Sequence, residues 1–320
     1  MKRLAAALLC AALMLLCLAG CTRAEPREEG GGPLIVATVF PEYDWVRQIL
    51  GQRQDAFRLE LLLDSGTDMH SFQPTARDMM LVSGCDLFVY VGGESDSWVQ
   101  DALREAVNPD METVCLMEVL ADSAWREEVR EGMQADEEEE EGEAYDEHVW
   151  LSLRRAAAVC RSLADAVSRL DPDGAEIYAA NAREYTAKLD ELDKRFSAAA
   201  GQGRVDTLVF ADRFPFLYLM KDLGLDYYAA FPGCSAETEA GFDTVIFLAD
   251  RVRELGLGAV LTIDGSDGKV ARAVAENCGG EVAILTMDSM QSVTAQDIAG
   301  GETYLGIMEK NLQVLESAVA

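Results

Sequence analysis

The sequence is poor in histidine, and its basic residues are far fewer than its acidic ones. Its 320 residues include two histidines, and 27 Lys and Arg stand against 57 Asp and Glu, for a net charge of −30. So acidic a chain is poorly matched to nucleic acid or to an anionic membrane surface, because both attract basic surfaces. We therefore expect no nucleic-acid partner, and we expect cations as ligands.

The common catalytic signatures are also missing. The sequence has no H-E-x-x-H, no G-x-S-x-G, no P-loop and no G-x-G-x-x-G pattern. Their absence argues against the enzyme classes that these patterns mark. We expect the protein to catalyse no reaction.

The eight cysteines show no informative spacing. Three lie within the first 21 residues, and the other five contain no C-x-x-C pair. This is neither a zinc-ribbon pattern nor a dense disulfide framework. Cys234 and Cys278 are conceivable zinc ligands, but packing in the interior is the favoured interpretation.

Long apolar runs are scarce, and the one clear example is N-terminal. Lys2 and Arg3 precede an apolar run over residues 4–18, which is too short to span a membrane but suits a signal peptide. Small residues then lead directly to Cys21, and this arrangement resembles a bacterial lipoprotein box. We expect residues 1–20 to be removed and Cys21 to carry a lipid at the start of a flexible tether, 21–33. An ordinary signal peptide is the alternative.

The rest of the chain alternates between strand-like and helix-like patterns. In the first half, strands are indicated at 34–38, 57–63 and 87–91, and a helix at 152–170. In the second half, strands are indicated at 207–210, 259–262 and 282–285, and helices at 215–223, 241–256, 268–278 and 301–317. Such alternation predicts an α/β fold with mainly parallel sheets.

A long helical stretch separates the two halves. Residues 175–200 carry apolar side chains with a helical period, and at 1.5 Å per residue the helix would be about 38 Å long. We therefore expect two α/β lobes, 34–172 and 201–320, joined by a helix at 173–200. The first lobe contains an acidic loop, 134–147, which we expect to be solvated, although it could also gather cations.

The two histidines lie in comparable loops. His70 follows a predicted strand and precedes a helix with a capping signal, and His148 comes between the acidic loop and the next helix. Loops at the carboxyl ends of parallel strands commonly bind ligands, and neutral imidazole is a common metal ligand. A structural role is the alternative for each histidine.

The segments around both histidines resemble those of a known family. M-H-S-F-Q-P-T-A-R-D-M around His70 and D-E-H-V-W-L around His148 are similar to the two histidine motifs of the substrate-binding lipoproteins of bacterial zinc and manganese ABC importers. The resemblance extends over residues 34–317. It implies two pseudo-symmetric lobes joined by a rigid helix, a metal ion in the cleft between them, and an ABC permease as partner.

The same resemblance implies further ligands. In that family a third ligand, often histidine, follows the first strand of the second lobe, but segment 210–216 of this chain offers Asp212 and Arg213 instead. Asp212 could replace the lost ligand, whereas a guanidinium cannot ligate a cation. Glu237 and Asp288 match segments that supply carboxylates in the family, and Asp212 would substitute for Glu237 or add to it. A helix cap or a surface charge is the alternative for each acid.

Two imidazoles and two carboxylates suit Zn(II), and the oxygen ligands also admit Mn(II). Zinc is the expected ion because one site generally binds it more tightly than manganese. We thus expect a monomeric extracytoplasmic protein, lipid-anchored to the cell membrane, that captures Zn(II) and delivers it to an ABC permease. The alternatives are a manganese-preferring member of the family, an adhesion lipoprotein that has lost the metal, and a secreted metal-dependent hydrolase.

Overall fold

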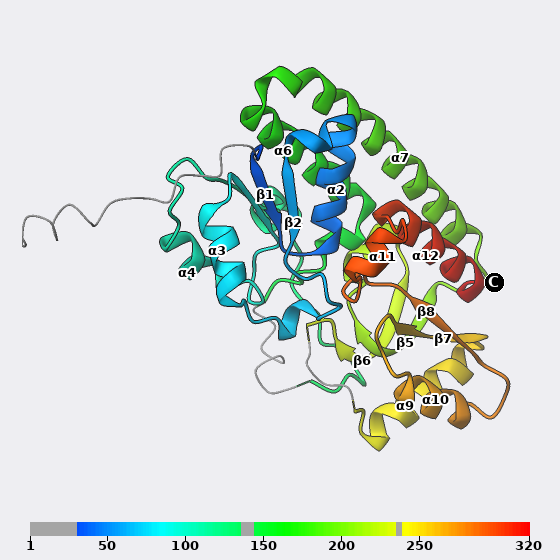
Figure 1. Ribbon diagram of the computed structural model, residues 1–320. Helices are drawn as coiled ribbons and strands as arrows, with labels where there is room; N and C mark the ends of the chain where they lie inside the picture. Colours follow the sequence, from blue (N-terminus) through cyan, green and yellow to red (C-terminus); the bar gives the residue numbers. More distant parts are fainter. Residues whose placement is uncertain (1–30, 136–143, 235–238) are drawn as a thin grey trace, which may run out of the picture. The chain divides into compact units, whose positions relative to one another are not determined.

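Two four-stranded sheets organise the structure, a computed structural model that describes residues 31–135, 144–234 and 239–320. All pairings between these strands are parallel. The first sheet has the order β2-β1-β3-β4 and the second the order β6-β5-β7-β8, so the two lobes repeat one topology (Figure 1). The predicted fold class, two α/β lobes with mainly parallel sheets, is confirmed.

The first lobe contains β1 (Leu34–Ala37), α2 (Phe40–Leu50), β2 (Arg58–Leu61), α3 (Ala76–Gly84), β3 (Leu87–Tyr90), α4 (Val99–Arg104), β4 (Glu112–Cys115), α5 (Leu116–Val119) and α6 (Leu153–Leu170). The second contains β5 (Thr207–Phe214), α8 (Leu217–Leu223), β6 (Asp226–Pro232), α9 (Phe242–Leu255), β7 (Ala259–Ile263), α10 (Lys269–Asn277), β8 (Ala283–Met287), α11 (Ala295–Ala299) and α12 (Tyr304–Ala318).

Helix α7 (Ala175–Gln202) lies between the two sheets in the sequence and is 28 residues long. It runs past both lobes in Figure 1 and packs against α2 and α6 of the first lobe and α12 of the second. Its buried side chains recur every three to four residues, as expected of a helix with one apolar face. The lobe boundaries at 172 and 200 stay a prediction.

The second lobe differs in two respects from what its sequence pattern predicts. Strand β6 is not predicted, because its centre holds two alanines, which have little preference for strands; in the first lobe, the short β4 is missed as well. Strand β5 is longer than expected, since it continues past an irregularity after Phe210 and pairs with β6 as far as Phe214. Asp212 and Arg213 therefore lie in a strand and not in the expected loop, 210–216.

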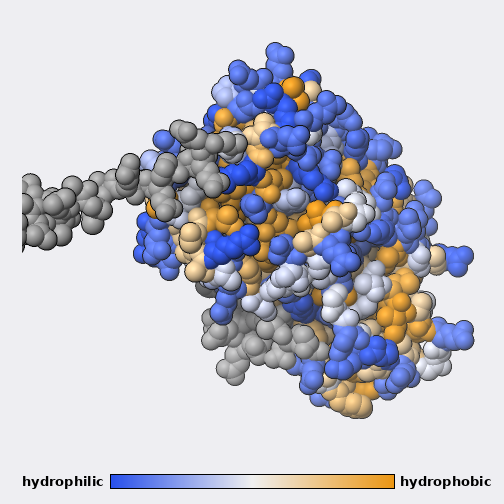
Figure 2. Space-filling view, in the orientation of Figure 1, coloured by the Kyte–Doolittle hydropathy of each residue, from blue (hydrophilic) through white to orange (hydrophobic). Residues whose placement is uncertain are grey.

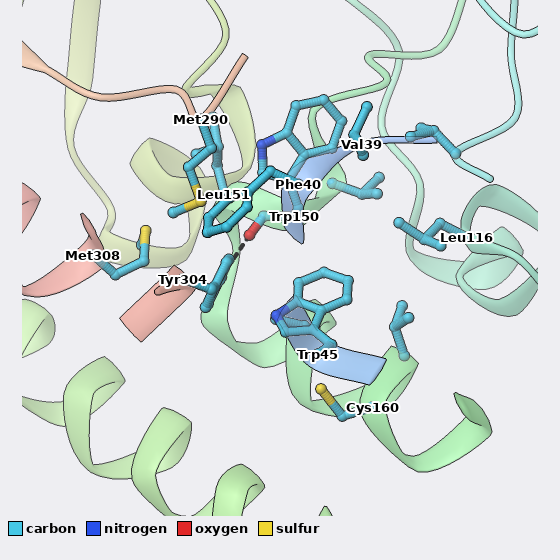
Figure 3. Packing of buried hydrophobic residues seen from close by; sticks show 14 of the residues in the cluster. Val39, Phe40, Trp45, Leu116, Trp150, Leu151, Cys160, Met290, Tyr304 and Met308 are labelled. Carbon is cyan, nitrogen blue, oxygen red and sulfur yellow. Dashed lines mark hydrogen bonds between the residues drawn. The ribbon is translucent and has the colours of Figure 1, made fainter. Parts of the chain in front are cut away.

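One hydrophobic core runs through both lobes. Figure 3 shows Trp45 and Trp150 of the first lobe beside Tyr304 and Met308 of the second. The Tyr304 ring meets Trp45 edge to face, and its hydroxyl donates to the carbonyl oxygen of Trp150 at 2.6 Å. The indole Nε1 of Trp150 donates to the carbonyl oxygen of Ser289 at 2.9 Å. Trp150 thus ties the segment after His148 to the second lobe.

The exterior is mixed in character. Figure 2 shows a face covered mostly by hydrophilic residues, with apolar residues in scattered patches. Over the described ranges, no helix is both long enough and apolar enough to cross a bilayer.

The Tyr304 hydroxyl gives a first test of this core. Tyr304→Phe should lower the free energy of unfolding by about 1–2 kcal/mol, because it leaves the buried Trp150 carbonyl without this donor. Tyr185→Phe is the matched control, since the Tyr185 hydroxyl is buried and has no hydrogen-bond partner among the described residues. Urea unfolding would measure both. Equal losses from the two variants would contradict the assigned role of the Tyr304 hydroxyl.

Glu42, at the start of α2, gives a pH-dependent test. One carboxylate oxygen accepts from Thr38 and Val39, and the other is buried with no partner in the described structure. Burial and the nearby Asp96 raise the pKa of Glu42 from 4.5 to about 8. A carboxyl group whose pKa is higher in the folded than in the unfolded protein stabilises the fold at a pH below its unfolded pKa. This stabilisation is lost as the pH rises to the pKa of the folded state.

We therefore expect the free energy of unfolding of the metal-free protein to fall by a few kcal/mol, on the order of 2–4, between pH 5 and pH 8. Glu42→Gln should flatten this slope in urea titrations, because it has no charge to bury. Glu105→Gln, at an exposed side chain, should leave the slope unchanged. An unaltered slope in Glu42→Gln would refute the assignment.

Candidate metal centre

His70 is held by a short turn in the loop after β2. The turn, Met69–Ser71, is capped by Asp68, whose Oδ1 accepts from the backbone N–H of His70 at 3.0 Å. Met69 is buried in the core. The backbone at His70 is therefore held in place by the Asp68 hydrogen bond and by the buried side chain of Met69.

His148 is held by the segment that leads into α6. The next three residues, 149–151, form a turn whose side chains are all buried. Asp146 Oδ1 accepts from the backbone N–H of His148 at 2.8 Å. The position of this imidazole is therefore set by core packing as well as by the hydrogen bond to Asp146.

The two imidazoles face each other. Their Nε2 atoms lie 3.2 Å apart, close to the separation of about 3.3 Å expected for two nitrogens bound to one tetrahedral zinc ion at 2.0–2.1 Å. Each Nδ1 is held from behind, by Ser95 Oγ at 2.7 Å for His70 and by Asp146 Oδ1 at 3.1 Å for His148. Such outer contacts orient histidine ligands in metal sites.

Electrostatics distinguish the two rings. Burial, together with the charge of His148, lowers the pKa of His70 to about 3. Burial alone would lower the pKa of His148, but the carboxylates of Asp146 and Glu147 outweigh it and raise that pKa. At neutral pH His70 is therefore in the unprotonated form that binds metal ions.

Cys234 lies close to both histidines. It follows β6, is partly buried, and its backbone N–H donates to Glu127 Oε1 at 2.8 Å. In the described ranges, the group of side chains able to hold a metal ion consists of His70, His148 and Cys234, whose ligand atoms all lie within 4.8 Å of one another. The group joins two loops of the first lobe to one of the second.

The predicted acidic ligands are placed differently. Glu237 lies outside the described residues, as do Cys21 and residues 136–143 of the acidic loop. Asp212 and Asp288 are described but do not join the two histidines.

Both described acids already have partners. Asp212 accepts from the Thr262 hydroxyl at 2.5 Å and from the backbone N–H of Arg213 at 2.9 Å. Asp288 accepts from the backbone N–H of Met290 at 2.7 Å, and burial, with the nearby Asp264, raises its pKa to about 7. These contacts hold both carboxylates outside the group that contains the two histidines.

Arg213 forms an ion pair across the cleft. Its guanidinium lies 2.7 Å from Asp68 Oδ2, while Oδ1 of the same carboxylate caps His70. Burial alone would raise the pKa of Asp68, but Arg213 and His70 outweigh it and lower that pKa. Asp68 therefore stays ionised and links the second lobe to the His70 loop.

Two side chains at this centre carry little signal in the sequence. Ser95 lies 25 residues beyond His70 in the sequence, and no local motif marks it as an outer partner. For Cys234 the sequence admits zinc ligation, although it favours interior packing. The signal for ligation is that Cys234 shares a segment with Glu237, a predicted ligand, and that a thiol is a soft metal ligand.

Comparison with known proteins gives consistent matches. A family model described as the periplasmic zinc-uptake complex component A matches residues 35–318. The zinc-binding protein AdcA of Streptococcus pyogenes serotype M3 is 28% identical over 302 residues, 92% of this chain and 57% of that protein. The high-affinity zinc uptake system protein ZnuA of Bacillus subtilis is 25% identical over 316 residues, 97% of this chain and 95% of that protein. The chain thus spans little more than half the length of the AdcA protein it matches.

Solved structures agree with these matches. The Zn(II)-bound ZnuA-like domain of Streptococcus pneumoniae AdcA superimposes with a TM-score of 0.71 at 27% identity, covering 90% of this chain and 99% of that one. A laminin-binding adhesin (Lmb) from Streptococcus agalactiae gives a TM-score of 0.74 at 22% identity, covering 90% of this chain and 100% of that one. At that identity the second likeness shows the fold alone.

The outer partner of His148 offers a test of this geometry. Asp146→Asn should weaken Zn(II) binding about 10-fold or more, because it removes the charge that orients and polarises the imidazole. Asp110→Asn, at an exposed position, is the matched control. Competition with a fluorescent zinc chelator would measure both affinities. Equal affinities for the two variants would mean that Asp146 does not act on a metal ligand.

Proposed function

The chain belongs to the family of the periplasmic zinc-uptake complex component A, and on this premise we propose that it captures Zn(II) outside the cytoplasm and passes it to an ABC permease. The protein acts by binding and release, and no reaction is part of this function. Zinc-binding names among the relatives support the choice of ion.

One observation carries the proposal: the facing Nε2 atoms of His70 and His148, 3.2 Å apart. At this distance the two nitrogens are hydrogen-bonded in the metal-free protein, with one proton between them; a metal ion that displaces this proton would accept a lone pair from each ring. The Nδ1 atoms are already engaged by Ser95 and Asp146, so both free lone pairs can point to one ion. His70 and His148 are therefore the proposed ligands.

The surrounding charge favours the same ion. Asp146 and Glu147 are almost fully buried beside the rings, and the whole chain carries a net charge of −30. Buried carboxylates offset the charge of a desolvated dication, and a strongly acidic protein attracts cations over several ångströms. Zn(II) fits this setting, and Mn(II) would require more oxygen ligands than the described centre offers.

Further ligands and the anchor complete the proposal. Glu237, three residues after Cys234, would supply an oxygen ligand. Asp212 and Asp288 would do so only after moving toward the two histidines. Cys21 would carry the lipid that holds a monomeric protein at the membrane near its permease. A zinc-binding lipoprotein AdcA among the relatives supports the anchor.

The direct test is metal content together with thermal stability. Purified protein should contain close to one zinc per chain by elemental mass spectrometry. Stripped protein titrated with Zn(II) should gain on the order of 10 °C in Tm at a thousandfold excess over Kd. The double variant His70→Ala, His148→Ala should lose both the zinc and the shift.

Ser97→Ala, in the loop that also carries Ser95, is the control that should bind as the parent does. A hydrolase would in addition turn over ester or amide substrates when loaded with zinc. An absence of zinc together with an unchanged Tm would refute the proposed function.

A further inference from the structure

Cys234 is distinguished from the other described cysteines by its neighbours. The structure describes five free thiols, Cys85, Cys115, Cys160, Cys234 and Cys278. Of these, only Cys234 belongs to the group of possible metal-binding side chains that includes His70 and His148. The other four are buried, and none of them is part of that group.

The backbone before Cys234 is shaped to approach His148. A Cβ atom placed on Gly233 would lie 2.7 Å from the carbonyl oxygen of Phe214 and 3.3 Å from Cε1 of the His148 ring. A side chain there would push the end of β6 away from the imidazole. Glycine at this point therefore lets the next residue bring its thiol to the histidine pair.

A hydrogen bond from the first lobe also holds Cys234 near the histidines. Glu127 of the first lobe accepts from the backbone N–H of Cys234 at 2.8 Å. The thiol sulfur lies within 4.8 Å of the ligand nitrogens, and a tetrahedral zinc ion with bonds of 2.0–2.3 Å would bring these atoms to about 3.5 Å. A movement of about 1 Å therefore completes the contact.

On the premise of the proposed function, we propose that Cys234 is the third protein ligand of the metal ion, so that the centre is a His2Cys site with one ligand from the second lobe. As the sulfur–zinc bond forms, the thiol gives up its proton to water. The resulting thiolate and two neutral imidazoles leave the fourth position of a tetrahedral ion for water or an oxygen ligand.

Arg213 explains why the third ligand comes from the segment after β6 and not from β5. The guanidinium cannot ligate a cation, and in this structure it pairs with Asp68 at 2.7 Å. The side chain that β5 directs to the cleft thus supports the His70 loop. Cys234, two residues after the end of the adjacent strand β6, supplies the coordinating atom.

A thiolate makes the site selective. Sulfur is a soft ligand that favours Zn(II), Cu(I) and other thiophilic ions, whereas Mn(II) prefers carboxylate, carbonyl and water oxygens. Replacing the thiol with a hydroxyl should therefore reduce zinc affinity much more than manganese affinity. The predicted substrate class is a thiophilic metal ion.

Co(II) is the probe that reports on sulfur directly. The purified full chain loaded with Co(II) should show a thiolate-to-cobalt charge-transfer band in the near ultraviolet together with the visible bands of a four-coordinate ion. Cys234→Ser should lose the charge-transfer band, and its Zn(II) affinity should fall at least about 10-fold. Cys278→Ser, a buried cysteine outside the group, is the matched control and should resemble the parent.

Alkylation of the unmodified protein provides a second test that does not depend on a variant folding. Iodoacetamide at mildly alkaline pH, followed by peptide mapping, should label Cys234 in stripped protein slowly, because burial raises the pKa of its thiol, and Zn(II) should protect it at least 10-fold whereas Mn(II) should not. Cobalt bound without a charge-transfer band, or Cys234 labelled equally with zinc bound, would overturn the third ligand and leave the proposed function intact. Parent protein that binds neither Co(II) nor Zn(II) would overturn both.

Discussion

Two imidazole nitrogens that face each other at 3.2 Å are the constraint around which this molecule is arranged. Without a metal ion, a proton between the nitrogens allows that approach, and the surrounding protein holds the rings in place. Ser95 and Asp146 fix the rings from behind, and Asp68 and the buried turn after His148 fix the backbones. A site prepared in this way binds a cation with little further loss of conformational freedom, because the ligands are already ordered.

Hydrogen bonds and an ion pair near the two histidines also connect the first lobe to the second. Trp150, two residues after His148, donates to Ser289 and accepts from Tyr304, both in the second lobe. Arg213 and Asp68 form a second connection, on the side of the other histidine. With α7 packed against helices of both lobes, these links leave little freedom for large opening. Metal exchange is therefore expected to involve local movement of loops around the cleft more than rotation of whole lobes.

Much of this architecture was predictable because the signals are local. Alternating strand and helix patterns predicted the parallel sheets, and a 3.6-residue period predicted α7. The histidines stood out because there are only two, each in a loop beside carboxylates. Cys234 could not be placed in the same way, since its position depends on β6, whose central alanines hide the strand. Likewise, the ion pair of Arg213 with Asp68 joins residues 145 positions apart, and no sequence period reveals such a contact.

One metal ion is expected between His70 and His148, and a crystal structure of the zinc-loaded protein, with anomalous data collected at the zinc edge, would locate it. We expect one strong anomalous peak at about 2.0–2.1 Å from both Nε2 atoms. A peak bound only to carboxylates elsewhere, or imidazoles left 3.2 Å apart with no peak between them, would contradict this expectation.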